Sequence, residues 1–192
     1  MEDRFLVTKA VLECYPYIDD MYDALTRSAD KCVADGFYAI FAEEQMRLYE
    51  QIMKYNDRKV GLYNLKYIIE KGMNGSNEVF RARYLQGKSA SEIAVQGGGK
   101  LRTIYRQLQK GLATFTFTLE LMGFNKKRLL KEFGNEPLFS SMLKRVIEED
   151  DEAARMRKEC KKVNTEAFRE LSPRNNHRHS HPRQDSDDRV YA

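Results

Sequence analysis

The stretch Gly87–Leu108, "GKSASEIAVQGGGKLRTIYRQL", decides how the middle of this chain is organised. It begins with a helix start at Ser89, breaks at the three glycines of Gly97–Gly99, and resumes as a basic amphipathic segment. Ser89 and Glu92 have the spacing of a capping box, in which the hydroxyl accepts from the Glu92 amide and the carboxylate accepts from the Ser89 amide. The stretch therefore predicts two short helices joined by a glycine turn.

Apolar spacing extends this stretch into a module of three helices. A helix over about Ser76–Leu85 precedes it, with Phe80 and Tyr84 one turn apart on the inner face. The capped helix buries Ile93, beside the small Ala94, which allows another helix to cross closely. The last helix carries an inward stripe at every fourth position: Ile104, Leu108 and Leu112.

The outer faces of the last helix carry polar and basic groups with one aromatic: Lys100, Arg102, Tyr105, Arg106, Gln109 and Lys110. Arginine can pair with guanine through two hydrogen bonds, and glutamine can do so with adenine. The segment from Val79 to Lys131 contains eleven basic and two acidic residues, a net charge of +9, whereas the first 60 residues lean acidic. This charge distribution predicts a module that faces a polyanion, attached to a more acidic scaffold.

The module resembles region 4 of bacterial sigma-70 family RNA polymerase sigma factors and the small phage or mobile-element regulators that reuse its helix-turn-helix. The resemblance covers about residues 76–113 and matches the family pattern without a gap. The matching positions are Val79, Phe80, Arg83, Tyr84, Gly87, Ser89, Glu92, Ile93, Ala94, Gly98, Thr103, Ile104, Leu108 and Leu112. Gly97 and Gly99 stand where the family has apolar residues, Lys100 replaces its Ser or Thr cap, and Leu101 replaces a polar residue.

The resemblance implies double-stranded DNA as the partner and assigns two sets of contact residues. With Gln109 added from the outward face, the base-facing set is Leu101, Arg102, Tyr105, Arg106 and Gln109. The phosphate-contacting set is Lys88, Ser89, Lys100, Thr103 and Lys110. The first 75 residues show no sign of the sigma region that melts promoters, so the resemblance implies a regulator that contacts RNA polymerase or a sigma factor rather than a complete sigma factor.

We expect an all-α fold in four parts. Residues 1–72 form an acidic helical region for dimerisation or partner binding, with Pro16 as a kink or boundary and "NDRKVG" at 56–61 as an interruption. Here Phe37, Phe41, Leu48, Ile52 and Tyr55 are expected on one helix face. The DNA-binding module occupies 73–124, C-terminal helices occupy 125–171, and 172–192 form a disordered tail.

The composition argues against an enzyme, a cofactor or a metal site. All three histidines lie in the tail, which excludes a Ser-His or Cys-His pair within the folded body, and the three cysteines are widely separated. No apolar run is long enough for a membrane helix, and the acidic start does not resemble a secretory signal, so we expect a cytoplasmic protein.

Two other functions stay open at this level. A phage small terminase-like packaging adaptor also places a helix-turn-helix beside long oligomerising helices, and ring formation would favour it. A helical protein-interaction module that does not bind DNA is the other alternative, favoured by the glycine turn and by Leu101.

Overall fold

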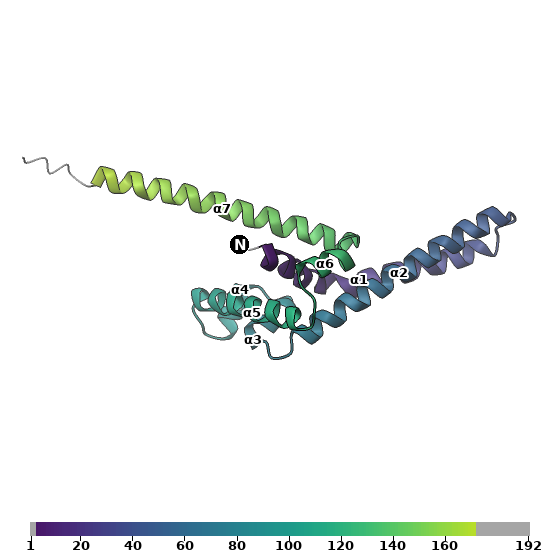
Figure 1. The fold of residues 1–192 in the computed structure, drawn as a ribbon. Helices are drawn as coiled ribbons and strands as arrows, with labels where there is room; N and C mark the ends of the chain where they lie inside the picture. The colour runs from purple at the N-terminus through teal and green to yellow at the C-terminus, as the bar shows by residue number, and fades with distance from the viewer. Residues whose placement is uncertain (1–2, 172–192) are drawn as a thin grey trace, which may run out of the picture. The chain divides into compact units, whose positions relative to one another are not determined.

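The structure, a computed structural model, describes residues 3–171, with side chains described as far as residue 162. All regular secondary structure of the described residues is helical, with no strand, which confirms the all-α prediction (Figure 1). The helices are α1 (Asp3–Gly36), α2 (Ala42–Gly72), α3 (Glu78–Tyr84), α4 (Ala90–Gln96), α5 (Leu101–Leu121), α6 (Lys126–Phe133) and α7 (Pro137–Leu171). The predicted disordered tail, with its histidines, lies outside the described residues.

The chain divides into two compact units at residue 151. The first unit contains α1 to α6 and the beginning of α7. In the second unit, the described part is the remainder of α7, whose side chains from 155 to 162 are exposed. None of the described helices is both long and apolar enough to cross a membrane.

Helices α1 and α2 pack side by side as a long helical hairpin (Figure 1). The predicted boundary at Pro16 is wrong, because α1 continues through this position without interruption, whereas the alternative of a kink there stays a prediction. A proline removes one backbone hydrogen bond. Here the buried residues on either side, Leu12 and Ile18, keep the helix in register against its neighbours.

The predicted interruption of the second helix at 56–61 is wrong, since α2 is continuous from Ala42 to Gly72. Within this segment Arg58 donates two hydrogen bonds to Glu136, at 2.9 and 3.3 Å, and Leu62 directly after it is fully buried. These non-local contacts hold a polar stretch in helical form. Glu136 is buried, with its side chain 9 % exposed, and the Arg58 guanidinium neutralises its carboxylate.

The expected apolar face from Phe37 to Tyr55 is also wrong in its first part. Phe37 precedes α2, Phe41 is its N-cap residue, and both side chains are exposed. Only Leu48, Ile52 and Tyr55 are half-buried. The side chains that pack firmly against α1 come later in α2: Leu62, Leu65 and Ile69.

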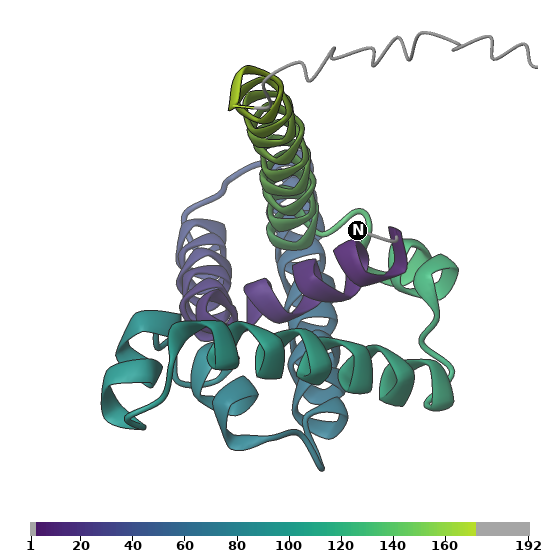
Figure 2. The ribbon, with the colours of Figure 1, turned by 90° about the vertical axis from the view of Figure 1, so that its left-hand side faces the viewer.

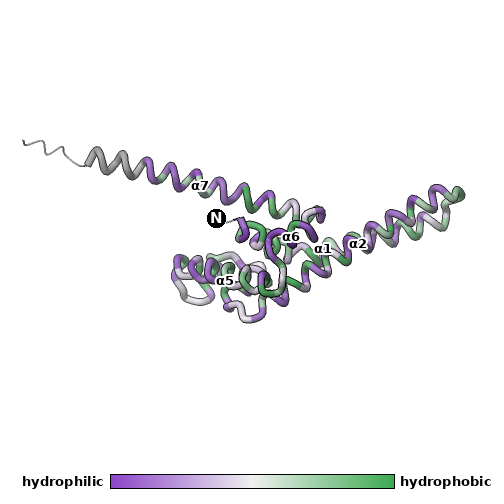
Figure 3. Tube along the Cα trace, in the orientation of Figure 1, coloured by the Kyte–Doolittle hydropathy of each residue, from purple (hydrophilic) through white to green (hydrophobic). Residues whose placement is uncertain are grey.

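One hydrophobic core joins segments that the sequence suggested were separate. Its largest fully buried side chains are Phe80, Phe115 and Phe139, from α3, α5 and α7, together with leucines and isoleucines of α1 and α2. Figure 3 shows hydrophobic residues interspersed with hydrophilic ones along α1, α2 and α5. The Gly72–Asn77 turn is therefore a local turn at the edge of a shared core, although it separates two regions of different charge.

Helix α5 crosses the N-terminal part of α1, with α3 and α4 beside it (Figure 2). The close approach of α3 and α5 depends on Gly111. A Cβ atom at this position would overlap the Phe80 ring, lying within 2.6 Å of its Cγ. Phe80 in turn stacks at tilted angles on Tyr84 and Phe115, with ring centroids 4.8 and 6.1 Å away.

Candidate nucleic-acid interface

Helix α3 is fixed at its start by Asn77. The Asn77 side chain accepts from the Phe80 amide at 2.8 Å, and its Nδ2 donates to the Gln107 carbonyl of α5 at 3.3 Å. The predicted orientation is confirmed, because Phe80 and Tyr84 are both buried. Asn77 thus acts twice, as an N-cap and as a tie between α3 and α5.

Helix α3 is also bound to α1. Arg83 lies 3.9 Å from Glu13, whose carboxylate also accepts from Arg145 at 3.0 Å. Burial, reinforced by the negative charge of Glu13, raises the pKa of Tyr84 to about 12. The first helix of the module is therefore anchored to the scaffold by packing and by charge.

Helix α4 has the capping box that the sequence predicts. The Ser89 hydroxyl accepts from the Glu92 amide at 3.1 Å, and the Ser89 amide donates to the Glu92 carboxylate at 2.6 Å. These hydrogen bonds from Ser89, backbone first, lower the pKa of Glu92. Because a capping box closes locally, within four residues, it could be identified from sequence alone.

The glycine turn has a defined backbone. Gly97 ends α4 with its amide donating to the Ile93 carbonyl at 3.0 Å, and the Gly99 amide donates to the Ala94 carbonyl at 3.0 Å. Gly98 has φ +60°, a conformation that other residues adopt at a cost. At Gly99 a Cβ atom would lie 3.6 Å from Ile104 Cδ1, in ordinary contact, so a small side chain fits there.

The module has its own small core between α3, α4 and α5. Ala82, Ile93 and Ile104 are its buried residues, with Leu108 and Ala94 packed against them. The inward stripe of α5 is confirmed, since Ile104 and Leu112 are buried and Leu108 is half-buried. Lys100, at the N-cap of α5, makes no side-chain cap bond, as its chemistry predicts.

The structure brings the five candidate base-facing residues together. All five are exposed on α5 and line one open depression of the surface: Leu101, Arg102, Tyr105, Arg106 and Gln109. They cover an arc beside the buried stripe, since successive residues of a helix are separated by about 100°: Leu101 lies nearest the stripe and Arg106 lies farthest from it. A shallow surface of this kind has no enclosed pocket for a small substrate.

The candidate phosphate-contacting residues are more dispersed. Lys88 and Thr103 line a common groove bounded by all three helices of the module. Lys100 and Lys110 are exposed on α5, whereas the Ser89 hydroxyl is occupied by the capping box. Lys88 also donates from Nζ to Gln96 at 3.0 Å, so its ammonium group is partly engaged.

Within the described part of the chain, the basic side chains on the α5 face have no acidic partner. The side chains of Lys100, Arg102, Arg106 and Lys110 make no hydrogen bond or ion pair there. Other basic residues are paired, as in Lys126 with Asp3 at 2.9 Å and Arg128 with Glu132 at 2.6 Å. The positive charge of the α5 face is therefore uncompensated by neighbouring residues.

One surface residue near the turn was missed by the sequence reasoning. Val95, in the last turn of α4, is 83 % exposed although it is apolar. Its position in the last turn before Gly97–Gly99 could have indicated this, because a helix of seven residues buries only one narrow face. Groups of three or more metal-binding side chains are also lacking among the described residues.

Comparisons of the chain with protein-family models, with curated proteins and with solved structures found no match.

Proposed function

We propose that the protein is a DNA-binding transcriptional regulator, in which α3, α4 and α5 work as a helix-turn-helix of the sigma region 4 type. The observation that carries this proposal is the α5 face, where Arg102, Arg106 and Gln109 line one open depression beside Tyr105. These side chains combine long reach with donors and acceptors suited to base edges in a major groove. They are exposed, and their basic groups have no acidic partner among the described residues.

Electrostatics supports the same proposal. A duplex attracts unpaired lysine and arginine side chains, because neutralised phosphates release condensed counterions. In this proposal Lys100 and Lys110 contact phosphates on either side of the base-facing residues, and Lys88 and Thr103 reach phosphate from the groove beside α4. Ser89 acts through the capping box, which fixes the orientation of α4.

The proposed role is regulatory and depends on a second partner. A module of this type activates or represses transcription when another surface of the protein contacts RNA polymerase or a sigma factor. The long α1–α2 hairpin, which packs against α3 and α5 at one end only, supports such a division of labour. Cytoplasmic localisation belongs to the same proposal.

Fluorescence anisotropy with a random duplex pool, across a salt series, tests the proposal. We expect the logarithm of the association constant to fall linearly with the logarithm of the salt concentration. We also expect a sequence motif to be enriched among the bound duplexes. The double variant Arg102→Ala/Arg106→Ala should lose the motif, because each two-pronged contact contributes about 1–3 kcal/mol of base discrimination. The fold should be kept, since both side chains are exposed.

The control is Lys127→Ala/Lys131→Ala, which also removes two positive charges, but from exposed positions of α6. This control should keep the motif and lose only a little general affinity. If both double variants affect binding equally, α5 does not read bases and the proposed interface is wrong.

A second candidate function is a protein-docking surface, which one observation favours. Val95, Leu101 and Tyr105 are 83, 42 and 54 % exposed, and together they make part of the module's surface apolar. The salt series separates the two candidates: a docking module shows no duplex binding even at low salt, whereas a DNA reader binds most tightly there.

A further inference from the structure

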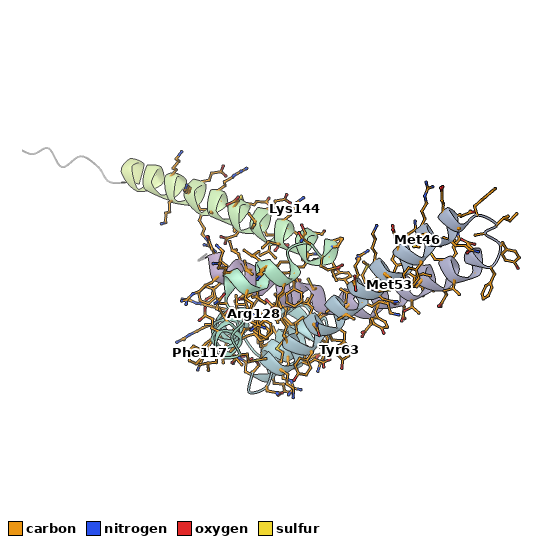
Figure 4. All side chains as sticks on the ribbon, turned by 45° about the vertical axis from the view of Figure 1, so that its right-hand side comes forward. Met46, Met53, Tyr63, Phe117, Arg128 and Lys144 are labelled. Atoms are coloured by element: carbon orange, nitrogen blue, oxygen red, sulfur yellow. The ribbon has the colours of Figure 1, made fainter. Side chains whose placement is uncertain are left out.

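Helix α2 carries a second apolar stripe that no described residue covers. Starting at Met46, exposed residues follow at alternating intervals of three and four: Met46, Tyr49, Met53, Asn56, Val60, Tyr63 and Tyr67. The six apolar or aromatic members, here called the outer stripe, are 44–65 % exposed. Figure 4 labels Met46, Met53 and Tyr63 along α2.

The spacing of the outer stripe is that of a coiled-coil seam. Alternating steps of three and four are the a and d positions of a heptad, and the stripe keeps them for three heptads, over about 31 Å of helix. The inner stripe of α2, including Leu62, Leu65 and Ile69, packs against α1. Hence α2 presents apolar side chains on two opposite faces, and only one of them is used within the described chain.

The polar member of the series supports a specific pairing. Asn56 lies at the middle of the seam, with Tyr49 and Tyr63 each seven residues away. A single asparagine in such a seam fixes register and the number of strands at a cost in stability. On a surface that only faces water, the six large apolar or aromatic side chains around Asn56 are unexpected.

Charges beside the outer stripe are separated along its length. Residues 42–55 of α2 include three acidic and two basic residues, whereas residues 57–72 include two acidic and four basic residues. A second copy of α2 in the antiparallel direction would place the acidic half of each helix against the basic half of the other. The stripe is therefore complementary to itself in that direction, which favours the correct partner and orientation.

The area is sufficient for a stable dimer. A fully buried aromatic side chain covers about 150–250 Å², so six half-exposed large side chains offer roughly 600 Å². A stable interface takes about 800 Å² from each partner, and flanking charged residues supply the remainder. The connection before α2 adds more apolar surface, because Phe37, Tyr38 and Ile40 are 83–87 % exposed.

We propose that the outer stripe of α2 is a homodimer interface, in which two copies of the chain pair their α2 helices antiparallel with Asn56 near the two-fold axis. This interface does not depend on the proposed DNA binding. A membrane surface is a poorer occupant, because Asp35, Glu43 and Glu44 border the exposed connection and are repelled by anionic lipid.

Sedimentation equilibrium of the full chain, without DNA, measures the association directly. We expect the wild-type chain to have twice the monomer mass of 22.5 kDa. Met53→Glu/Val60→Glu should lower the mass to that of a monomer without changing the helical content, because both side chains are exposed. Lys54→Glu, an exposed position of α2 outside the stripe, should stay dimeric.

Cysteine cross-linking tests the direction of pairing, in a Cys160→Ser background that removes the exposed native thiol. Antiparallel pairing brings position 49 of one copy beside position 63 of the other, because both lie seven residues from Asn56. A mixture of Tyr49→Cys and Tyr63→Cys chains should therefore cross-link to each other, whereas Tyr49→Cys chains alone should not.

Several outcomes would overturn the proposal. They are a wild-type monomer, a dimer that survives Met53→Glu/Val60→Glu, a ring of many copies, and cross-linking of Tyr49→Cys chains with themselves. A monomer that binds vesicles of phosphatidylcholine and phosphatidylserine would assign the exposed connection to a lipid surface instead. DNA affinity is measured separately, so failure of the dimer leaves the proposed DNA interface untouched.

Discussion

The main core and the module core of the first unit differ in size and in what maintains them. The main core buries large side chains from six helices, with Phe80, Phe115 and Phe139 fully enclosed. The module core has three buried residues, Ala82, Ile93 and Ile104. Helices α3 and α5 contribute to both cores, whereas the buried residue of α4 belongs to the module core alone. Local hydrogen bonds therefore contribute a larger share of the stability of α4 than of any long helix.

The largest expected effects on stability come from truncating one buried residue in each core. Phe80→Ala removes a fully buried ring and should cost about 3–5 kcal/mol of unfolding free energy, whereas Ile93→Ala should cost about 2–4 kcal/mol. We expect the Phe80 variant to accelerate amide hydrogen exchange throughout α1, α2, α3 and α5. The Ile93 variant should accelerate it in α4 and the glycine turn.

Denaturant unfolding followed by circular dichroism measures the unfolding free energy of each variant. Amide hydrogen exchange shows which helices are destabilised in each. If Ile93→Ala also accelerates exchange in α1 and α2 to the extent that Phe80→Ala does, the two cores unfold as one cooperative unit and the distinction between them fails.

The capping box offers a smaller test that depends on pH. In the folded chain the pKa of Glu92 lies below its usual value of 4.5. The ionised carboxylate therefore stabilises the folded chain fully above pH 4.5, and this stabilisation is lost as the pH falls through the lower pKa of the folded chain. A carbon-detected NMR titration of the Glu92 carboxyl should give a midpoint below 4.5. Ser89→Ala, which costs about 1 kcal/mol, should move the midpoint upward.

A Glu92 midpoint at or above 4.5 in the wild-type chain would show that the box is open in solution. Asp3, which lies outside the module and whose pKa is lowered by the hydrogen bond that it accepts from Lys126, serves as an internal reference in the same spectrum because Ser89→Ala should leave that contact intact.

The smallest expected effects come from two neighbouring glycines. Gly99→Ala should stabilise the module by about 0.4–1 kcal/mol, because it restricts the unfolded chain and its Cβ contacts Ile104 without overlap. Gly98→Ala should destabilise it by about 1 kcal/mol, since φ is +60° there. Thermal unfolding of the two variants compares them directly. Equal shifts in the same direction would contradict the turn geometry described above.

Features encoded over a few residues could be predicted from the sequence. The capping box of Ser89, the Asn125 cap that accepts from the Arg128 amide at 3.0 Å, and the outward face of α5 all depend on spacing along one helix. The five candidate base-facing residues share one surface for the same reason. Their contact with DNA stays a prediction.

Features that depend on distant contacts were predicted poorly. Pro16 suggested a boundary and residues 56–61 suggested an interruption, yet both helices are continuous because packing against neighbours outweighs local preference. The exposure of Phe37 and Phe41 could not be anticipated, because periodicity shows which residues share a face but not whether another helix covers that face.

The sequence by itself determined the helical class of the described chain, the capped α4 and its glycine turn, and the basic polar face of α5. Each of these follows from hydrogen bonds or side-chain directions within one or two helical turns. Only the tertiary structure decided that α1, α2, α3 and α5 share a core, and that the inner stripe of α2 is covered while the outer stripe is exposed. The physical reason is that burial depends on which helices meet, and heptad spacing is the same on a face that packs within the chain and on one that does not.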